Sequence, residues 1–404
     1  MKTPSMMRRH GGFSLVELMV SVVVGLLALM FATKLVVNGE QSKAVSLGGS
    51  DAMQNGMLAL FSLSGDAGQA GWGINDNRVN GCNTLLTDAN GYQLLQVQAA
   101  GALATPLAPV VIQSNGLASD QIEFNFSGSS SAIASLGLSQ SYNLNDAILT
   151  TDTNNAYGYG ASGYGMNVVL VAHDPAIPGG KCAIGEVGNV AIATTVITLA
   201  VPVAGRYAAA GGLGEAYGNN SARVFNLGPE RLLSFHTWSV QNGVLLLRST
   251  NLAGASAAPV SVVDNVVAIK AQYGFDLSPA VGPAPGNVRW SADNGMVVSQ
   301  WSGPMIDADG DGVAGAPGDF QRIAAVRIAV VARSKNPEKP SVKTGLCTAT
   351  TAMPTVFTSA SPATTAAVPM TVNVAVGGDT VDWKCYRYRV FETIVPMRNL
   401  EWRP

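Results

Sequence analysis

An apolar run near the N-terminus constrains this chain more than any other feature. From Phe13 to Val37 the sequence reads FSLVELMVSVVVGLLALMFATKLVV, in which Glu17 and Lys34 are the only charged residues. About twenty apolar residues form a helix of roughly 30 Å, which is long enough for one bilayer crossing. The run therefore predicts a transmembrane helix over residues 13–37, to which the rest of the fold is attached.

The residues before this run predict processing and orientation. Residues 1–12 read MKTPSMMRRHGG and are polar and basic. A secretory signal is cut after its apolar region, whereas the small pair Gly11 and Gly12 precedes it here, so cleavage at this pair leaves the helix on the mature chain. Because Arg8 and Arg9 lie on the short flank, we expect the N-terminus in the cytoplasm and the bulk of the chain in the periplasm.

The segment GGFSLVELMVSVVVG resembles the class III leader and helix start of type IV prepilins and type II secretion pseudopilins. The resemblance implies that a prepilin peptidase cuts between Gly12 and Phe13 and that the new N-terminal Phe13 is methylated. Glu17 is then the fifth residue of the mature chain. Major pilins usually carry a helix-kinking proline where this chain has Lys34, so the melting that accompanies helix packing is expected to differ.

Glu17 is the one carboxylate inside the apolar run. Such a group costs about 2–3 kcal/mol in a membrane helix, so it usually marks a partner. A free amino group on Phe13, from the same or a neighbouring subunit, would pair with Glu17 and fix the axial register of stacked helices. The alternative is that Glu17 snorkels to the lipid headgroups from near the helix end.

Composition favours an exported, loop-rich β protein. Only 12% of the 404 residues are charged, and 45 are glycine. Loss of Lys2, Arg8 and Arg9 with the leader takes the formal net charge from −2 to −5. No basic surface is then expected, which argues against nucleic acid as a partner.

The four cysteines predict disulfide bonds rather than a metal centre. They are an even number, they form no CxxC motif, and no histidine lies at a zinc-ligand spacing. Three pairings are possible in an oxidising periplasm, and the local ones join Cys82 with Cys182 and Cys347 with Cys385. The second closes a Thr/Ala/Pro-rich span, for which the chain-entropy model gives a stabilisation of roughly 4 kcal/mol.

The rest of the chain divides into a helical spine and a β-rich head. Helical spacing over Met53, Met57, Leu58, Leu60 and Phe61 predicts that the helix continues over residues 38–70 and ends near Gly65 to Gly71, although several glycines weaken this pattern. Short strand-like runs follow from about Trp72, and Asn242-Gly243 predicts a type I′ hairpin turn. The expected fold is α+β and pilin-like, with a leader (1–12), a transmembrane assembly helix (13–37), its periplasmic continuation (38–70) and an antiparallel β-sheet head (71–404).

Three later segments extend the resemblance. DNVVAIKAQYGFD, RIAAVRIAVVARS and RVFETIVPMRN are similar to segments of PilW-type minor pilins, and a C-terminal loop closed by Cys347 and Cys385 resembles the pilin D-region. The resemblance implies a minor pilin that primes type IV pilus assembly. Its implied partners are other minor pilins, the major pilin, a PilY-type tip adhesin, the inner-membrane assembly platform and the prepilin peptidase.

One segment has a ligand pattern. In DADGDGVAGAPGD the carboxylates of Asp307, Asp309 and Asp311, followed by glycine, match the first half of a calcium loop. The twelfth position is Gly318 instead of a bidentate Glu, and Asp319 follows it. Any calcium loop would therefore be non-standard or completed from elsewhere. The alternatives are a calcium site with Asp307, Asp309, Asp311 and Asp319 as candidate ligands, and a solvated acidic turn.

Other chemical motifs are weak. GYGASG, with Gly158, Gly160 and Gly163, fits GxGxxG but lacks the strand and helix of a nucleotide site, so we interpret it as a loop. The histidines are interpreted as structural. Arg322, Arg327 and Arg333 share a strand region and suggest an interaction face or simply its solvent side.

The expected role is therefore assembly without enzymatic activity, since no acid, base and nucleophile cluster. Two alternatives remain: a type II secretion minor pseudopilin, and a tip adhesin or binding module whose surface is formed by the loops of residues 73–222.

Overall fold

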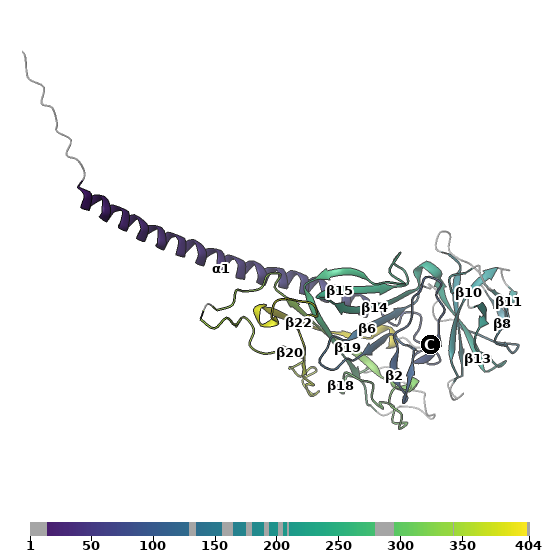
Figure 1. The fold of residues 1–404 in the computed structure, drawn as a ribbon. Helices are drawn as coiled ribbons and strands as arrows, with labels where there is room; N and C mark the ends of the chain where they lie inside the picture. Colours follow the sequence, from purple (N-terminus) through teal and green to yellow (C-terminus); the bar gives the residue numbers. More distant parts are fainter. Residues whose placement is uncertain are drawn as a thin grey trace, which may run out of the picture.

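The computed structural model describes residues 14–128, 135–155, 165–174, 180–189, 194–200, 205–207, 210–278, 295–341 and 343–401. A single long helix, α1 (Leu15–Gln69), projects from a β-rich head that packs on its C-terminal part (Figure 1). The other α-helices of the described residues, α2 (Pro317–Phe320) and α3 (Arg398–Glu401), are single turns. The fold is α+β and pilin-like, as the sequence predicts.

Helix α1 is continuous despite its glycines, and two of them lie where the head approaches the helix. A Cβ at Gly56 would fall 2.1 Å from the ring of Phe391, and one at Gly48 would fall 3.1 Å from the Cβ of Ser334. Each glycine costs about 1 kcal/mol of helix propensity, and burial against the head offsets that cost. Glycines that weaken the helical pattern in the sequence thus allow the helix to pack.

A four-stranded antiparallel sheet lies against α1. Its order is β18-β17-β19-β22, with bounds Gln300–Ser302, Val266–Phe275, Ile323–Arg333 and Tyr388–Pro396. Every residue of β17 is buried, because both faces of the sheet are covered. Helix α1 covers one face, and the segment around Val356 and Phe357 packs on the other.

The next sheet has five antiparallel strands in the order β16-β15-β14-β6-β5. Their bounds are Val260–Asp264, Val244–Ser249, Ser234–Gln241, Gln121–Phe126 and Val110–Gln113. Asn242 and Gly243 join β14 to β15 with φ of 51° and 76°. The predicted type I′ hairpin is therefore confirmed.

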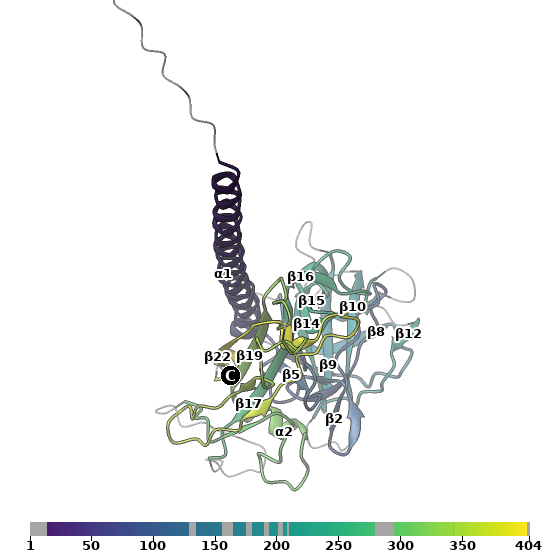
Figure 2. The same cartoon turned by 60° about the vertical axis from the view of Figure 1, so that its left-hand side comes forward.

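Figure 1 shows the third sheet farthest from the free end of α1, beyond the five-stranded sheet, and Figure 2 shows its strands β8 and β10 on the side of the head opposite β22. Its path is β4-β1-β10-β9-β13-β7, with β11 on β10 and β8 on β11. The pair β1–β10 is parallel, and the others are antiparallel. In path order the bounds are Pro106–Leu107, Cys82–Leu85, Cys182–Asn189, Asn167–His173, Ala222–Pro229, Ser135–Gly137, Thr194–Leu199 and Ile148–Asn155.

Smaller elements complete the head. They are the pair β2 (Val97–Ala99) and β3 (Ala102–Ala104), the pair β20 (Thr355–Val356) and β21 (Met370–Thr371), and β12 (Ala210–Leu213).

Two disulfides fasten the head, and both are the local pairings. Cys82–Cys182 joins β1 to β10, and Cys347–Cys385 closes the C-terminal loop. That loop is more than a tethered coil, because its residues Val356, Phe357, Val372 and Val374 form a buried cluster on β17 and β19.

Candidate functional site

The N-terminal part of α1 is suited to a membrane. Leu15–Val37 is long and apolar enough to cross a bilayer, and none of it is buried in the head. Glu17 lies in the first turn of this segment. Gly12 and Phe13 lie outside the described residues, so cleavage, methylation and the pairing of Glu17 stay predictions.

An apolar stripe continues along α1 beyond the membrane segment. Met53, Met57 and Phe61 follow each other at a spacing of four residues and are 54%, 55% and 75% exposed. The opposite face carries Ala59 and Leu63, which are fully buried against the head. The helix thus has one face filled by its own head and another apolar face open to a partner.

Close to its C-terminal end, α1 is bound to the head through Asp66. The Asp66 Oδ2 atom accepts a hydrogen bond from the Trp238 indole nitrogen at 2.7 Å and lies 2.8 Å from His236 Nδ1. Both partners are on β14. We call this three-residue cluster the helix latch, because it connects α1 to the five-stranded sheet.

The helix latch favours the protonated form of His236. Burial lowers the pKa of this imidazole, but the hydrogen bond and negative charge of Asp66 outweigh burial and leave the pKa above its usual 6.5. The other ring nitrogen, Nε2, lies 2.9 Å from Asn251 Oδ1. Two oxygen acceptors therefore satisfy both N–H groups of an imidazolium.

The second described histidine, His173, is also part of the fold. Its ring centroid lies 4.5 Å from that of Tyr217, and Nε2 lies 3.6 Å from Glu215 Oε1. His236 and His173 thus both contact neighbouring residues of the fold, in keeping with the structural role expected from the sequence.

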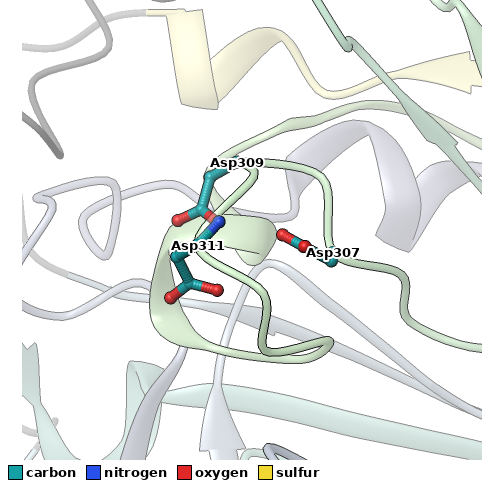
Figure 3. Close-up of side chains that lie close together, drawn as sticks. All are labelled: Asp307, Asp309 and Asp311. Carbon is teal, nitrogen blue, oxygen red and sulfur yellow. The ribbon is translucent and has the colours of Figure 1, made fainter.

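The acidic loop brings three of its four predicted carboxylates together. Ligand atoms of Asp307, Asp309 and Asp311 lie within 4.8 Å of one another, on a tight turn shown in Figure 3. Partial burial, followed by the charges of Asp311 and Asp307, raises the pKa of Asp309. Three hard oxygen donors on one turn are a set that suits calcium.

Asp319 has a different place in the loop. Its Oδ1 accepts backbone N–H groups from Ala308 and Asp309, and its Oδ2 accepts those of Gly315 and Ala316. Burial raises the pKa of Asp319 to about 6 despite these bonds. This carboxylate holds the loop closed rather than joining the other three.

The glycine at the twelfth position has a packing reason. A Cβ at Gly318 would lie 1.8 Å from Asp309 Oδ2, so a glutamate cannot stand there without moving that carboxylate. The loop is accordingly compact and built around Asp319, unlike a standard calcium loop.

The arginines of the strand region do not form an interaction face, so that suggestion from the sequence is wrong. Arg322 and Arg327 are 4% and 3% exposed. Arg327 lies over the ring of Phe357 at 4.8 Å and bonds Glu392, while Arg322 donates to the carbonyl of Ser278. Arg333 pairs with Asp379. These side chains hold loops of their own head. The GYGASG glycines lie outside the described residues.

Two polar clusters were missed from the sequence. Lys270 and Asp120 form an ion pair whose side chains are both fully buried, and Lys270 also donates to the carbonyls of Gly116 and Ala118. A lone lysine in the apolar run VVAIKAQYGF was the available signal. The helix latch left less trace, because Asp66 lies in a segment of small residues with nothing to mark its partner.

A free apolar anchor, an amphipathic continuation and a β-sheet head define a membrane-anchored protein of the pilin class. Two family models match the chain: Type IV Pilus-assembly protein W over residues 237–399, and Prokaryotic N-terminal methylation motif over residues 7–33. Together the two matches support a PilW-type minor pilin of the type IV pilus. Searches of curated proteins and of solved structures gave no match.

Proposed function

We propose that this protein primes type IV pilus assembly as part of a minor pilin complex at the pilus tip, and that its role is structural rather than catalytic. The observation that carries the proposal is the apolar stripe of Met53, Met57 and Phe61. An unpaired apolar face next to a membrane anchor is suited to pack against helices of other subunits as they leave the bilayer.

In this proposal the anchor lies in the inner membrane, with the leader in the cytoplasm and the head in the periplasm. The basic residues Arg8 and Arg9 support that orientation. The proposed partners are other minor pilins, the major pilin, a PilY-type tip adhesin, the assembly platform and the prepilin peptidase. Pairing of Glu17 with the Phe13 amine of a neighbour would set the axial register.

The stripe can be tested apart from the fold. Met57→Glu places a charge on a side chain that its own head leaves exposed, so we expect unchanged protein levels and unchanged melting of the head. A buried charge at a helix contact is strongly unfavourable, so we expect the number of pili counted by electron microscopy to fall sharply.

Gln69→Glu is the matched control, because Gln69 is also exposed on α1 and gains the same charge about 120° around the helix from Met57. Normal piliation is expected for this variant. Normal piliation in Met57→Glu as well would show that the stripe is not an assembly surface.

A further inference from the structure

A cavity of about 610 Å³ opens in the head on the side away from α1. It forms where the loop of residues 86–96 crosses the five-stranded sheet. Successive side chains point to opposite faces of a strand, so Thr237 and Ser239 of β14 face the cavity, while His236 and Trp238 point to α1 and contact Asp66. The volume is within the usual range for small-molecule sites.

The floor of this cavity is rigid. Glu123 is fully buried beneath it, and its Oε2 accepts hydrogen bonds from Leu95 N at 2.8 Å, Tyr92 OH at 3.1 Å and Thr237 Oγ1 at 3.2 Å. These bonds attach the crossing loop to β6 and β14. A ligand would therefore meet a preformed surface, which lowers the entropic cost of binding.

Arg248 fixes the same loop from the other side. Its Nε donates to the Ser256 carbonyl at 2.7 Å and its Nη2 donates to the Gly91 carbonyl at 2.8 Å. The guanidinium also lies 5.5 Å from the centroid of the Tyr92 ring. Among the described residues that line the cavity, Arg248 is the only charged one and none carries a carboxylate.

The polar groups that remain available are neutral. Within the described part of the chain, the carboxamides of Gln93, Gln96 and Gln121 and the hydroxyl of Ser239 make no hydrogen bond, although all four residues line the cavity. Each carboxamide both donates and accepts, as does a hydroxyl. Leu85, Leu86 and Leu94 add apolar wall between them.

Extended peptides fit this site poorly. Peptide recognition by strand addition needs an open sheet edge. The strands that line the cavity, β1, β6, β14 and β15, each have neighbours on both sides. The lining instead suits a compact ligand with many hydroxyl groups and apolar C–H faces.

We propose that this cavity binds a saccharide of one or two rings, with Gln93, Gln96, Gln121 and Ser239 hydrogen-bonding its hydroxyl groups and the leucines contacting its C–H faces. This binding activity is separate from pilus assembly, since the cavity lies in the head on the side away from the apolar stripe. It would give the tip of a pilus a glycan-recognition site.

The test is saturation-transfer NMR on the full-length protein. An amine-oxide detergent is used because a sugar-based detergent would compete with the saccharide probes for the cavity. The probes are lactose, maltose, cellobiose and N,N′-diacetylchitobiose. At least one is expected to give a saturable signal, and Gln121→Leu is expected to weaken its affinity tenfold or more, because a buried hydroxyl of the ligand loses its partner.

Gln98→Leu is the control, since Gln98 is exposed and outside the lining. If Gln121→Leu lowers the melting temperature, Gln96→Leu at the exposed rim replaces it. The proposal is overturned if no disaccharide gives a signal, if the lining variants bind as well as Gln98→Leu does, or if a glycine–serine peptide displaces the bound sugar.

Discussion

Removing the carboxylate of Asp66 should loosen α1 from the head, and the hydrogen bonds that are lost set the expected change in the free energy of unfolding. Asp66→Ala leaves the indole N–H of Trp238 and the imidazole of His236 without their acceptor, and both side chains are nearly buried. Each unsatisfied buried group costs about 1–3 kcal/mol.

A smaller effect opposes this loss. Asp66 is near the C-terminal end of α1, where a negative charge is unfavourable by about 0.3–1 kcal/mol, so its removal relieves the helix dipole. The hydrogen bonds outweigh the dipole, and we expect a net loss of about 3 kcal/mol in the free energy of unfolding. Ser64→Ala, which removes only a local bond to the Phe61 carbonyl, should stay within about 0.5 kcal/mol.

The helix latch also predicts a pH dependence. The folded pKa of His236 is raised above its unfolded value of 6.5, so its stabilisation is fully present below 6.5 and is lost as pH rises through the folded pKa. Other groups with raised pKa values, such as Asp319, contribute equally to wild type and to an Asp66→Asn variant, so their effect cancels when the two proteins are compared. When the pH is lowered from 8 to 6, the free energy of unfolding of wild type should therefore rise by more than that of Asp66→Asn.

The assay is urea denaturation of the full-length protein in detergent, followed by tryptophan fluorescence at several pH values. A loss below about 0.5 kcal/mol for Asp66→Ala would refute the hydrogen-bond argument, because that is the range of neutral surface changes. Identical pH profiles for wild type and Asp66→Asn would refute the assignment of the pH dependence to the His236 pair.

Three further predictions address other parts of the molecule. Lys270→Met leaves the buried carboxylate of Asp120 without its cation and should lower the free energy of unfolding, measured by urea denaturation, by about 3–5 kcal/mol. Adding Asp120→Asn should recover part of this loss. A loss below about 1 kcal/mol would contradict a buried ion pair. Calcium should raise the melting temperature of wild type but not that of Asp309→Asn. In chelator, Asp309→Asn should melt no lower than wild type, because the repulsion of Asp309 by Asp307 and Asp311 is removed. If calcium leaves the melting temperature of wild type unchanged, the loop has no calcium-binding role. Glu17→Ala should insert and fold normally yet give few pili, and an unchanged pilus number would exclude a register role for Glu17.

Local signals in the sequence predicted the elements well. The apolar run gave the anchor, Asn242-Gly243 gave the hairpin, and the segments DNVVAIKAQYGFD, RIAAVRIAVVARS and RVFETIVPMRN correspond to β17, β19 and β22. These signals succeed because each depends on a few neighbouring residues. The cysteines also allowed the two disulfides to be anticipated as the local pairings.

Long-range contacts were beyond the sequence. Nothing in the chain near Asp66 indicates that it meets His236 and Trp238, and nothing near Arg327 indicates that it is buried over Phe357. The alternation of arginines suggested a solvent side, but the sheet is covered on both faces. The cavity likewise depends on a loop crossing a separate sheet, which no local pattern encodes.

The central claim, a processed prepilin that enters a pilus, is tested most directly by mass spectrometry of the N-terminus of the membrane-extracted protein. The account predicts a mature chain that begins with methylated Phe13 and retains α1. A chain that still begins with Met1 in cells with an active prepilin peptidase would contradict it, and the protein would then be an anchored exported protein without a role in pilus assembly.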